Sequence, residues 1–508
     1  MIPSSLISAI ASELKDAPET AAITITKNSH GYKVERYDTT PPAESVSRSI
    51  EYLKECFGVE RLQRICKKPD ISLNASEIES NTLILTKTVM RNILIGVGDV
   101  QKADYDEVAQ LPPTERHQRL FPFASSMKSL TDALLGAAPK ISDFFIDRAS
   151  SSGKGIKGLI ERIFLSLNLQ LNLNRNQDNL QKNDYIIAET ITSQLADREW
   201  QEKSLIQLGT ATQPKYYYVD KVLIKGGAYI SILKDVDGTE PPKIICRGTA
   251  ARPSSTDAIN SLLNDLLIEI GMKGVKAVWP ELVEYLNANE IKSVELYGKS
   301  MGGAQALALS VLLEGVLNVH VDCLTTYCSV QAGYAVEIFN REILGKRTEQ
   351  DPFQIVVLRN GGKENETDNV PIVGGLHLGA DAPQNKCNVS VVYLQQGQEG
   401  EQVDVLPLEM GIFSRIFRFF KSFPGPHCRQ STLDNFNFKK LEPAEAQQHL
   451  RVGLIFEKCR LFLAYAIHLL TFTLFNGQFF SEFYSEQKAM ASSKVTSGIS
   501  PVEFVSPT

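Results

Sequence analysis

The sequence predicts an α/β fold built around a central, mostly parallel sheet with helices on both faces. Strand-like and helix-like segments alternate from about residue 221 to residue 358, and parallel strands need crossover helices of this kind between them. In the middle of that stretch, a β-prone run (293–297) leads through a turn of small residues into a helix-forming run (304–313). Ligands of open α/β sheets bind at the carboxyl ends of the strands, so this turn lies where an active site is expected.

Four regions are expected along the chain of 508 residues. Residues 1–180 have mostly helical patterning and contain no recognisable chemistry. The α/β domain is expected at 181–440, where the pattern changes to alternating strands and helices. An apolar helical extension is expected at 441–490, and a disordered tail at 491–508.

Each element of the α/β domain follows from its residues. Strands are expected where β-branched and apolar residues gather between turn signals, and helices where apolar residues recur every three to four positions. The expected strands are 222–224, 228–233, 243–246, 293–297, 319–326 and 353–358. The expected helices are 255–270, 275–289, 304–313 and 333–344. The Asp-Gly pair at Asp237 is typical of a hairpin turn and joins the second and third strands.

The turn before the third helix has the form G-x-S-x-G, which places a serine on a sharp strand-to-helix turn. Gly298 and Gly302 stand two residues on either side of Ser300, where a Cβ atom would collide as the chain doubles back. The N-terminus of the following helix directs free N–H groups at the site, and these stabilise an oxyanion. Ser300 is therefore the expected nucleophile; the alternative is a tight turn without chemistry.

A serine hydroxyl needs a base that takes its proton, and the base needs an acid that orients it. The histidines that follow the serine are His320, His377, His427, His449 and His468. His427 is preferred because it stands in a Pro-Gly-Pro-His-Cys loop, and catalytic side chains are often carried by loops. His449 and His377 are the alternatives. His320 lies in a predicted strand and His468 in an apolar helix, so both are expected to be structural.

Asp368 is the preferred acid because it follows the strand expected at 353–358. A carboxylate in a loop just beyond the carboxyl end of that strand can reach a histidine at the same edge of the sheet. Asp351 precedes the strand and so lies at its opposite end. Asp381 is the main alternative, and an exposed loop charge without a catalytic role is the other interpretation.

Composition excludes several classes of function. A formal net charge of −6 and an isoelectric point near 5.8 leave no basic surface of the kind that nucleic-acid-binding proteins carry. The eight cysteines have no zinc-type spacing, and free thiols in a reducing compartment are expected. A G-x-G-x-x-G match at 153–158 follows a serine run rather than a strand, so no nucleotide site is expected there. No cofactor or metal is expected.

Three segments bear on membranes and location. Residues 1–15 lack the pattern of a Sec-type signal peptide, so a cytoplasmic location, or export by another route, is expected. Residues 461–481 carry no charge but contain several polar side chains, which favours a buried or peripheral helix over a membrane span. Residues 412–423 form an amphipathic helix with aromatic and basic faces. This helix is expected either to pack as a lid or to contact an anionic membrane surface.

Four blocks of the sequence resemble the class 3 lipases of the α/β-hydrolase superfamily, and together they cover about residues 222–430. The blocks are Ile244-Ile245-Cys246-Arg247-Gly248-Thr249, the glycine and helix at 274–286, the elbow at 297–309, and Asp368-Asn369-Val370-Pro371. Their order along the chain matches the order in that family. The resemblance implies an α/β-hydrolase fold and the hydrolysis of a lipid ester, from an acylglycerol or a phospholipid.

The resemblance also implies roles for individual residues. Asp368 aligns with the aspartate of the family's Ser-Asp-His triad, in which Ser300 is the nucleophile and His427 the base. Thr249 ends the Arg-Gly-Thr block that helps to form the oxyanion hole, and the backbone N–H of Met301 follows the nucleophile in that role.

This chain departs from the family pattern at three places. Lys299 replaces the usual histidine before the nucleophile, Cys328-Ser329-Val330 replaces a Gly-x-Pro loop, and 361–365 is an insertion. These departures leave a second hypothesis open, because fold does not dictate function. In that hypothesis the chain is a catalytically inactive protein of hydrolase fold that binds a partner or a membrane.

Overall fold

The computed structural model describes most of the predicted α/β domain and, with gaps, the N-terminal region up to residue 120. The described ranges are 20–28, 31–66, 75–87, 100–120, 200–209, 214–248, 269–361, 375–396, 402–406, 436–452 and 480–497, together with single positions near 6–18, 89–93, 188–192 and at 371. Thr249, Asp368, His427, His468 and the segment 412–423 lie outside these ranges. The same is true of residues 255–268 of the helix expected at 255–270.

Contacts divide the chain into two units, which are described separately. The first unit contains residues 1–178 and 203–218, and the second contains 179–202 and 219–508.

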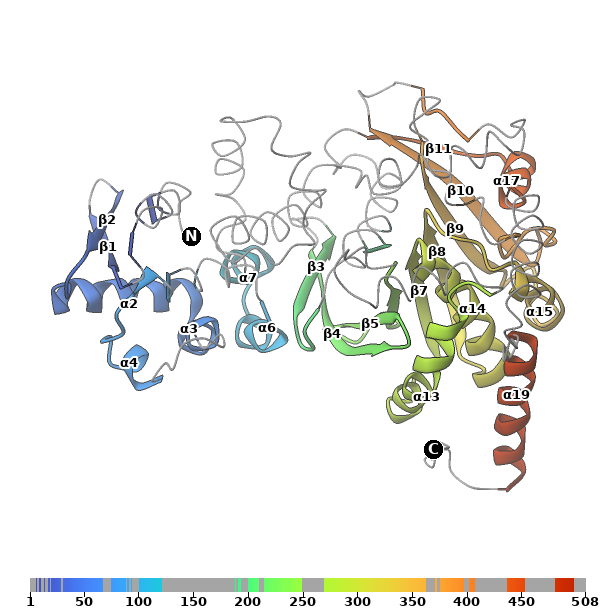
Figure 1. Ribbon diagram of the computed structural model, residues 1–508, viewed down its shortest axis with the longest axis horizontal. Helices are drawn as coiled ribbons and strands as arrows, with labels where there is room; N and C mark the ends of the chain where they lie inside the picture. Colours follow the sequence, from blue (N-terminus) through green and yellow to red (C-terminus); the bar gives the residue numbers. More distant parts are fainter. Residues whose placement is uncertain are drawn as a thin grey trace, which may run out of the picture. The chain divides into compact units, whose positions relative to one another are not determined.

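The first unit combines helices with a two-stranded sheet (Figure 1). Strands β1 (Ala22–Asn28) and β2 (Gly31–Tyr37) pair antiparallel, and the long helix α2 packs on β1. The helices are α2 (Ala43–Phe57), α3 (Val59–Cys66), α4 (Ala75–Glu79), α6 (Lys102–Val108) and α7 (Pro113–Leu120). Their apolar faces enclose a separate core, in which Ile50, Leu62 and Met90 are fully buried. The mainly helical pattern of this region therefore includes a β-hairpin.

A mixed sheet dominates the second unit. Among the described residues of this unit the strand order is β11-β10-β9-β8-β7-β6-β5-β4. The strands are β4 (Pro214–Lys225, in this unit from 219 on), β5 (Ala228–Asp235), β6 (Lys243–Cys246), β7 (Ser293–Lys299), β8 (His320–Tyr327), β9 (Phe353–Asn360), β10 (Cys387–Gln396) and β11 (Phe436–Lys440). Strand β3 (Leu205–Gly209) belongs to the first unit. Strands β6 to β10 are parallel, while β5 and β11 run antiparallel to their neighbours in this block. The α/β character expected from the sequence is confirmed.

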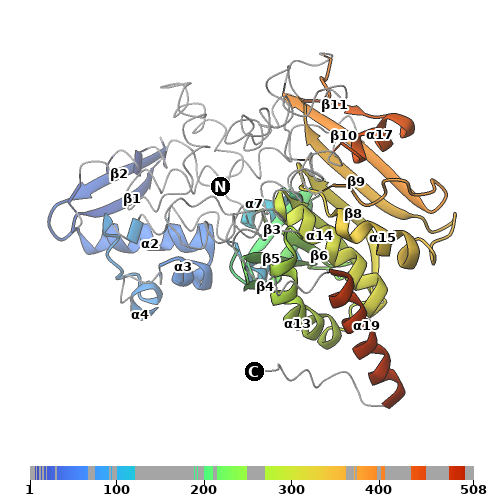
Figure 2. The same cartoon turned by 45° about the vertical axis from the view of Figure 1, so that its right-hand side comes forward.

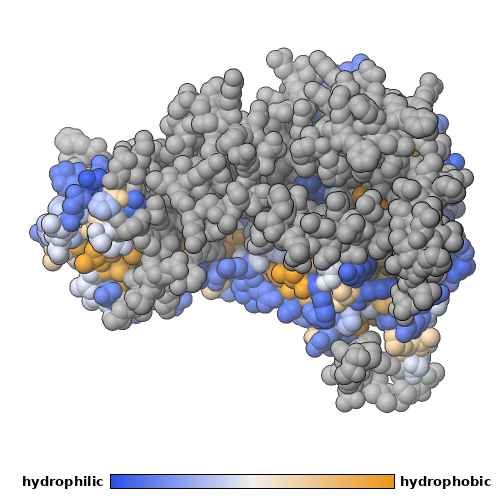
Figure 3. All heavy atoms as spheres, in the orientation of Figure 1, coloured by the Kyte–Doolittle hydropathy of each residue, from blue (hydrophilic) through white to orange (hydrophobic). Residues whose placement is uncertain are grey.

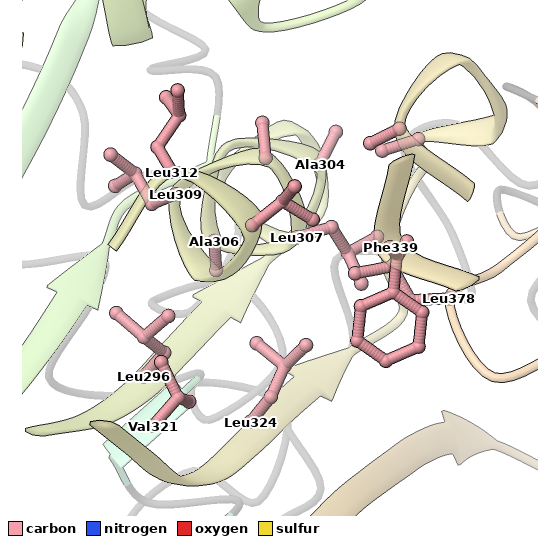
Figure 4. Packing of buried hydrophobic residues seen from close by; sticks show 14 of the residues in the cluster. Leu296, Ala304, Ala306, Leu307, Leu309, Leu312, Val321, Leu324, Phe339 and Leu378 are labelled. Carbon is pink, nitrogen blue, oxygen red and sulfur yellow. The ribbon is translucent and has the colours of Figure 1, made fainter. Parts of the chain in front are cut away.

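The helices of this unit surround one core. They are α13 (Met272–Ala288), α14 (Met301–Leu312) with the wide turn η2 (Leu313–Leu317), η3 (Gly333–Ala335), α15 (Val336–Ile338), η4 (Phe339–Ile343), α17 (Pro443–Leu450) and α19 (Phe480–Ser497). Leu296, Val321 and Leu324 of the sheet point toward Leu307 and its neighbours on α14 (Figure 4). Every side chain of α14 is buried, so this helix forms the centre of the domain.

Leu358 and Val392 belong to a second, smaller buried cluster, against which Ala188 packs, so the expectation of helices on both faces stays a prediction. The helices named above all share the first core with one face of the sheet (Figure 2). The physical reason is the strand order: β6 to β10 follow one another in space as they do in the sequence. Right-handed crossovers that always advance in the same direction place every crossover helix on the same side.

Several local expectations can be compared with the structure. The hairpin turn between β5 and β6 is confirmed, since Gly238 has φ 67° and the Thr239 N–H donates to Asp235 Oδ2 at 2.9 Å.

The six cysteines in the described part have free thiols. Helix α19 continues to Ser497, past the expected start of a disordered tail at 491, because its first turns are fixed by buried Phe480 and Tyr484. None of the described helices has both the length and the apolar character needed to cross a membrane.

Candidate active site

Ser300 adopts a backbone conformation that non-glycine residues rarely show. It has φ 53° and ψ −124°, between the end of β7 and the first residue of α14. Such conformations cost about 1–3 kcal/mol and persist only where neighbours fix them. Here the Ser300 N–H donates to the Tyr327 carbonyl at 3.1 Å, and the Ser300 carbonyl accepts from Gly303 and Val330 at 3.0 and 3.1 Å. The strained turn predicted from G-x-S-x-G is therefore present.

Three glycines allow the backbone to close around this turn. A Cβ on Gly298 would collide with the Gly302 carbonyl, and one on Gly302 would collide with the carbonyls of Cys246 and Arg247. A Cβ on Gly303 would collide with the Ser329 side chain. Each small residue thus permits contact with a different segment, and together they hold α14 against the ends of β6 and β8.

The side chain of Ser300 is half-buried at the carboxyl edge of the parallel strands. Its strand, β7, lies between β6 and β8 in the parallel block. The N-terminus of α14 begins at Met301, which is buried. The dipole of this helix end favours negative charge beside Ser300.

The end of β6 lies directly against the turn. A Cβ built on Gly248 would stand 3.0 Å from the Lys299 carbonyl oxygen and 3.2 Å from Ser300 Cβ. Arg247 is fixed in turn, because its N–H donates to the Tyr229 carbonyl at 3.0 Å and its guanidinium lies 4.9 Å from the centre of the Tyr229 ring. Thr249, the expected oxyanion residue, follows Gly248 and lies outside the described residues.

The expected acid, Asp368, also lies outside the described residues, but both ends of its loop are anchored. At the start, the Gly361 N–H donates to the Leu394 carbonyl at 2.7 Å. At the end, the buried side chain of Gln331 donates to the Pro371 carbonyl at 2.9 Å. Gln331 follows Val330, whose N–H donates to the Ser300 carbonyl. Pro371 is thereby linked to the serine turn through two hydrogen bonds and one peptide unit.

The loop that carries the expected base, His427, starts and ends at the same edge of the sheet as Ser300. Strand β10 runs parallel to β9 and ends at Gln396. Strand β11 is antiparallel and begins at Phe436, which pairs with Gln396. The carboxyl ends of parallel strands meet at one edge, so residues 397–435 connect two points on the edge where Ser300 stands. The position of His427 itself is not described.

The alternative bases His377 and His449 are fixed in structural roles. His377 is fully buried: its Nε2 lies 3.2 Å from Thr326 Oγ1 and its Nδ1 lies 2.7 Å from the Leu378 carbonyl. The Nδ1 of His449 lies 3.0 Å from the Tyr393 hydroxyl. Burial lowers the pKa of His377 to about 4, and burial together with the Arg359 cation lowers the pKa of His449 to about 3. Within the described part of the chain, neither ring hydrogen-bonds to Ser300.

The remaining alternatives lie away from the serine turn. His320 begins β8 and Asp351 precedes β9, so both stand at the amino edge of the parallel strands. They lie beside each other, with His320 Nε2 3.8 Å from Asp351 Oδ1. Asp381 precedes β10 and forms an ion pair with Arg451.

Two buried residues near the carboxyl edge were not predicted. Gln331 carries no local signal, because its role depends on a contact 40 residues away. Arg359 is 1% exposed and donates to the Tyr393 hydroxyl at 3.3 Å and to the His449 carbonyl at 3.1 Å. In a strand sequence nothing distinguishes a buried arginine of this kind from an exposed one.

No model of a known protein family matches this sequence, and no curated protein shows significant similarity to it. Within the described ranges, no three His, Cys, Asp or Glu side chains gather in a group that could hold a metal ion.

We expect Gly298→Ala to lower the free energy of unfolding by about 1–3 kcal/mol, because the new Cβ must displace the backbone of Gly302. Urea unfolding measures this change. Gly238→Ala is the control for a glycine without close neighbours: its positive φ adds backbone strain that Gly298 lacks, but no atom lies within 4 Å of the new Cβ. Equal losses in the two variants would contradict close packing at the turn.

The buried histidines predict a loss of stability in acid. The folded-state pKa of His377, about 4, lies below its ordinary value of 6.5, so the unfolded chain binds more protons between these values. The free energy of unfolding must therefore decrease as the pH falls from about 6.5 toward about 4. His377→Gln should flatten this dependence in urea titrations, while His320→Gln, at a partly exposed site, should not. Identical pH profiles in His377→Gln and the unmodified chain would contradict this account.

Proposed function

We propose that this chain is a serine ester hydrolase that acts on a lipid ester, from an acylglycerol or a phospholipid. The observation that carries the proposal is the backbone of Ser300, with φ 53° and ψ −124° at the carboxyl end of a central parallel strand. A turn of this kind raises a serine Oγ above the sheet at the start of a helix. A tight turn without chemistry has no need of a half-buried serine in a strained conformation.

The mechanism follows from serine hydrolase chemistry. His427 takes the proton of Ser300 Oγ as the oxygen attacks the ester carbonyl, and Asp368 orients the imidazole and stabilises its cation. The backbone N–H groups of Met301 and Thr249 hold the developing oxyanion. The imidazolium returns its proton to the leaving alcohol, and water then releases the acyl group from the serine.

The anchoring of Pro371 supports Asp368 as the acid. Asp368 precedes Pro371 by three residues, and three residues of extended chain span at most about 11 Å. Pro371 is held by Gln331, next to the residue that donates to the Ser300 carbonyl. The loop that begins and ends beside β10 supports His427 in the same way, since it opens at the carboxyl edge where Ser300 stands.

The α/β-hydrolase fold and the lipid substrate are the finer parts of the proposal. Both rest on the four blocks of residues that resemble the class 3 lipases, among which the Arg-Gly-Thr block places its Gly248 beside Ser300. The aromatic and cationic segment 412–423 supports a substrate that arrives from a lipid surface.

One observation favours the inactive alternative. Lys299, which stands where the resembling family has histidine, is only 7% exposed, so a basic side chain is held beside the nucleophile. A protein that retained the hydrolase fold without its chemistry would tolerate such a change.

Ser300→Ala separates the two proposals. We expect it to reduce hydrolysis of short-chain and long-chain p-nitrophenyl esters by at least about a thousandfold and to abolish labelling by a fluorophosphonate, since the nucleophile is lost. Ser293→Ala, at the opposite end of the same strand, is the matched control and should retain both. Absence of hydrolysis and labelling in the unmodified chain would favour the inactive protein. Equal activity in Ser300→Ala would contradict Ser300 as the nucleophile.

Gln331 should act as a positioning residue for the acid. We expect Gln331→Ala to lower kcat about tenfold to a hundredfold while KM changes little, because the anchor of the Asp368 loop is lost and binding groups are untouched. Gln354→Ala is the matched control: Gln354 also donates to a proline carbonyl, that of Pro352 at 3.0 Å, but at the amino end of β9. A drop in kcat of the same size in Gln354→Ala would contradict the positioning role.

A further inference from the structure

Strand β1 of the first unit has its outer edge covered. The Ile23 N–H donates to the Leu85 carbonyl at 2.9 Å, and the Lys87 N–H donates to the Ala21 carbonyl at 3.0 Å. The hydroxyl of Ser49, on α2, accepts from the Ile25 N–H at 2.7 Å and donates to the Ile25 carbonyl at 3.1 Å. The backbone groups of Ile23 and Ile25 therefore point away from β2.

The direction in which the backbone groups of β1 point also determines the direction for those of β2. Ile23 pairs with Arg36 and Ile25 pairs with Val34 in the antiparallel register. In an antiparallel pair of strands, two kinds of opposite residues alternate. In one kind the backbone N–H and C=O groups of both residues bond across the pair, and in the other kind both residues turn these groups outward. Val34 and Arg36 must then turn their N–H and C=O groups away from β1, and so must Tyr32, two residues earlier.

The outer edge of β2 has no backbone partner within the described part of the chain. Backbone donors and acceptors need partners, and a sheet edge supplies a row of them that can accept a further strand. The side chains here are mixed rather than apolar: Lys33 is 61% exposed and Glu35 is 33% exposed. Figure 3 shows mostly hydrophilic side chains where Figure 1 labels β1 and β2. A strand that pairs with this edge would therefore be recognised by backbone hydrogen bonds and by charge, rather than by an apolar surface.

We propose that the open edge of β2 pairs antiparallel with β2 of a second copy of this chain, centred on Val34. In that register the hydrogen-bonded pairs are Val34 with Val34 of the second copy, and Tyr32 with Arg36 in both directions. All three residues turn their backbone groups outward, as the pairing requires. The result is a continuous four-stranded sheet with twofold symmetry, in which each copy contributes the same surface.

The charge pattern selects this register over its neighbours. Centred on Val34, each Lys33 lies opposite Glu35 of the second copy, so two opposite-charge pairs form. A shift centred on Lys33 would place the two lysines opposite each other, and a shift centred on Glu35 would oppose the two glutamates. A register centred between two residues would place an outward-facing residue, such as Val34, opposite one whose backbone groups face β1, such as Lys33 or Glu35. Only the pairing about Val34 satisfies both the backbone and the charges.

The inner face fits the same arrangement. Tyr32 and Val34 pack against the core of the first unit, and the Tyr32 ring lies 5.2 Å from the Tyr52 ring of α2. In the paired sheet, Arg36 of each copy lies beside Tyr32 of the other, within reach of a cation–π contact. The contact is short compared with the roughly 1,600 Å² of a standard interface, so we expect a weak, concentration-dependent dimer.

Sedimentation equilibrium of the full chain, from about 1 µM to about 1 mM, tests the proposal. The unmodified chain should dimerise reversibly. Lys33→Glu and Glu35→Lys should each weaken the dimer by about tenfold or more, because each converts two opposite-charge pairs into like-charge pairs. The double variant with both changes exchanges the charges and should restore the dimer. Lys27→Glu, an exposed lysine on β1, is the matched control and should have no effect.

Hydrogen exchange resolved to single amides gives an independent measurement. The amides of Lys33 and Glu35 bond to β1 and should be protected at every concentration. Those of Val34 and Arg36 should exchange rapidly in dilute solution and become protected as the concentration rises. A chain that stays monomeric at 1 mM, or a dimer unaffected by both single variants, would overturn the proposal; failure of the double variant to restore the dimer would overturn the Val34 register.

Discussion

The strained backbone of Ser300 is the constraint on which the second unit depends. A non-glycine residue at φ 53° and ψ −124° is stable only because three hydrogen bonds hold it, one to Tyr327 and two from Gly303 and Val330. Those bonds use the last residue of β8, the first turn of α14 and the loop after β8. The same contacts therefore determine how β7 ends, how α14 leaves the sheet and where the chain after β8 must pass. A change in any one of them would release the turn and the packing that surrounds it.

Close approach of α14 to the sheet is the second consequence of that turn. Because Gly302 and Gly303 lack Cβ atoms, the first turn of the helix touches the backbone after β6 and the side chain of Ser329. A helix held so near the sheet cannot present a polar face, and all twelve residues of α14 are buried. Helix α13 packs on it, and α19 packs on η2, which continues α14, where Tyr484 lies over Gly315. The turn at Ser300 is thus supported from behind by a fully buried helix.

Local patterns predicted the parts of this fold that depend on neighbouring residues. The turn at Ser300, the strands from β5 to β9 and the helices α13 and α14 follow from periodicity and from glycine spacing. The side of the sheet on which the helices lie did not, because periodicity shows which face of a helix is buried but not which face of the sheet it covers. Strands β10 and β11 were not predicted either, whereas helix α17 falls within the helical extension expected at 441–490. The link from Gln331 to Pro371 joins segments 40 residues apart, and no single-sequence signal marks such a pair.

The buried cluster around Arg359 shows why the role of a histidine cannot be assigned from its position in the sequence alone. This guanidinium is 1% exposed, and no described carboxylate pairs with it. A buried charge of that kind is stabilised by neutral polar partners and opposes any further positive charge nearby. Burial, with a smaller contribution from this cation, lowers the pKa of both His377 and His449, and hydrogen bonds fix both rings. Within the described part of the chain neither ring hydrogen-bonds to Ser300. Residues 397–435, which connect β10 and β11 at the carboxyl edge of the sheet, are therefore the segment in which the proposed base is to be sought.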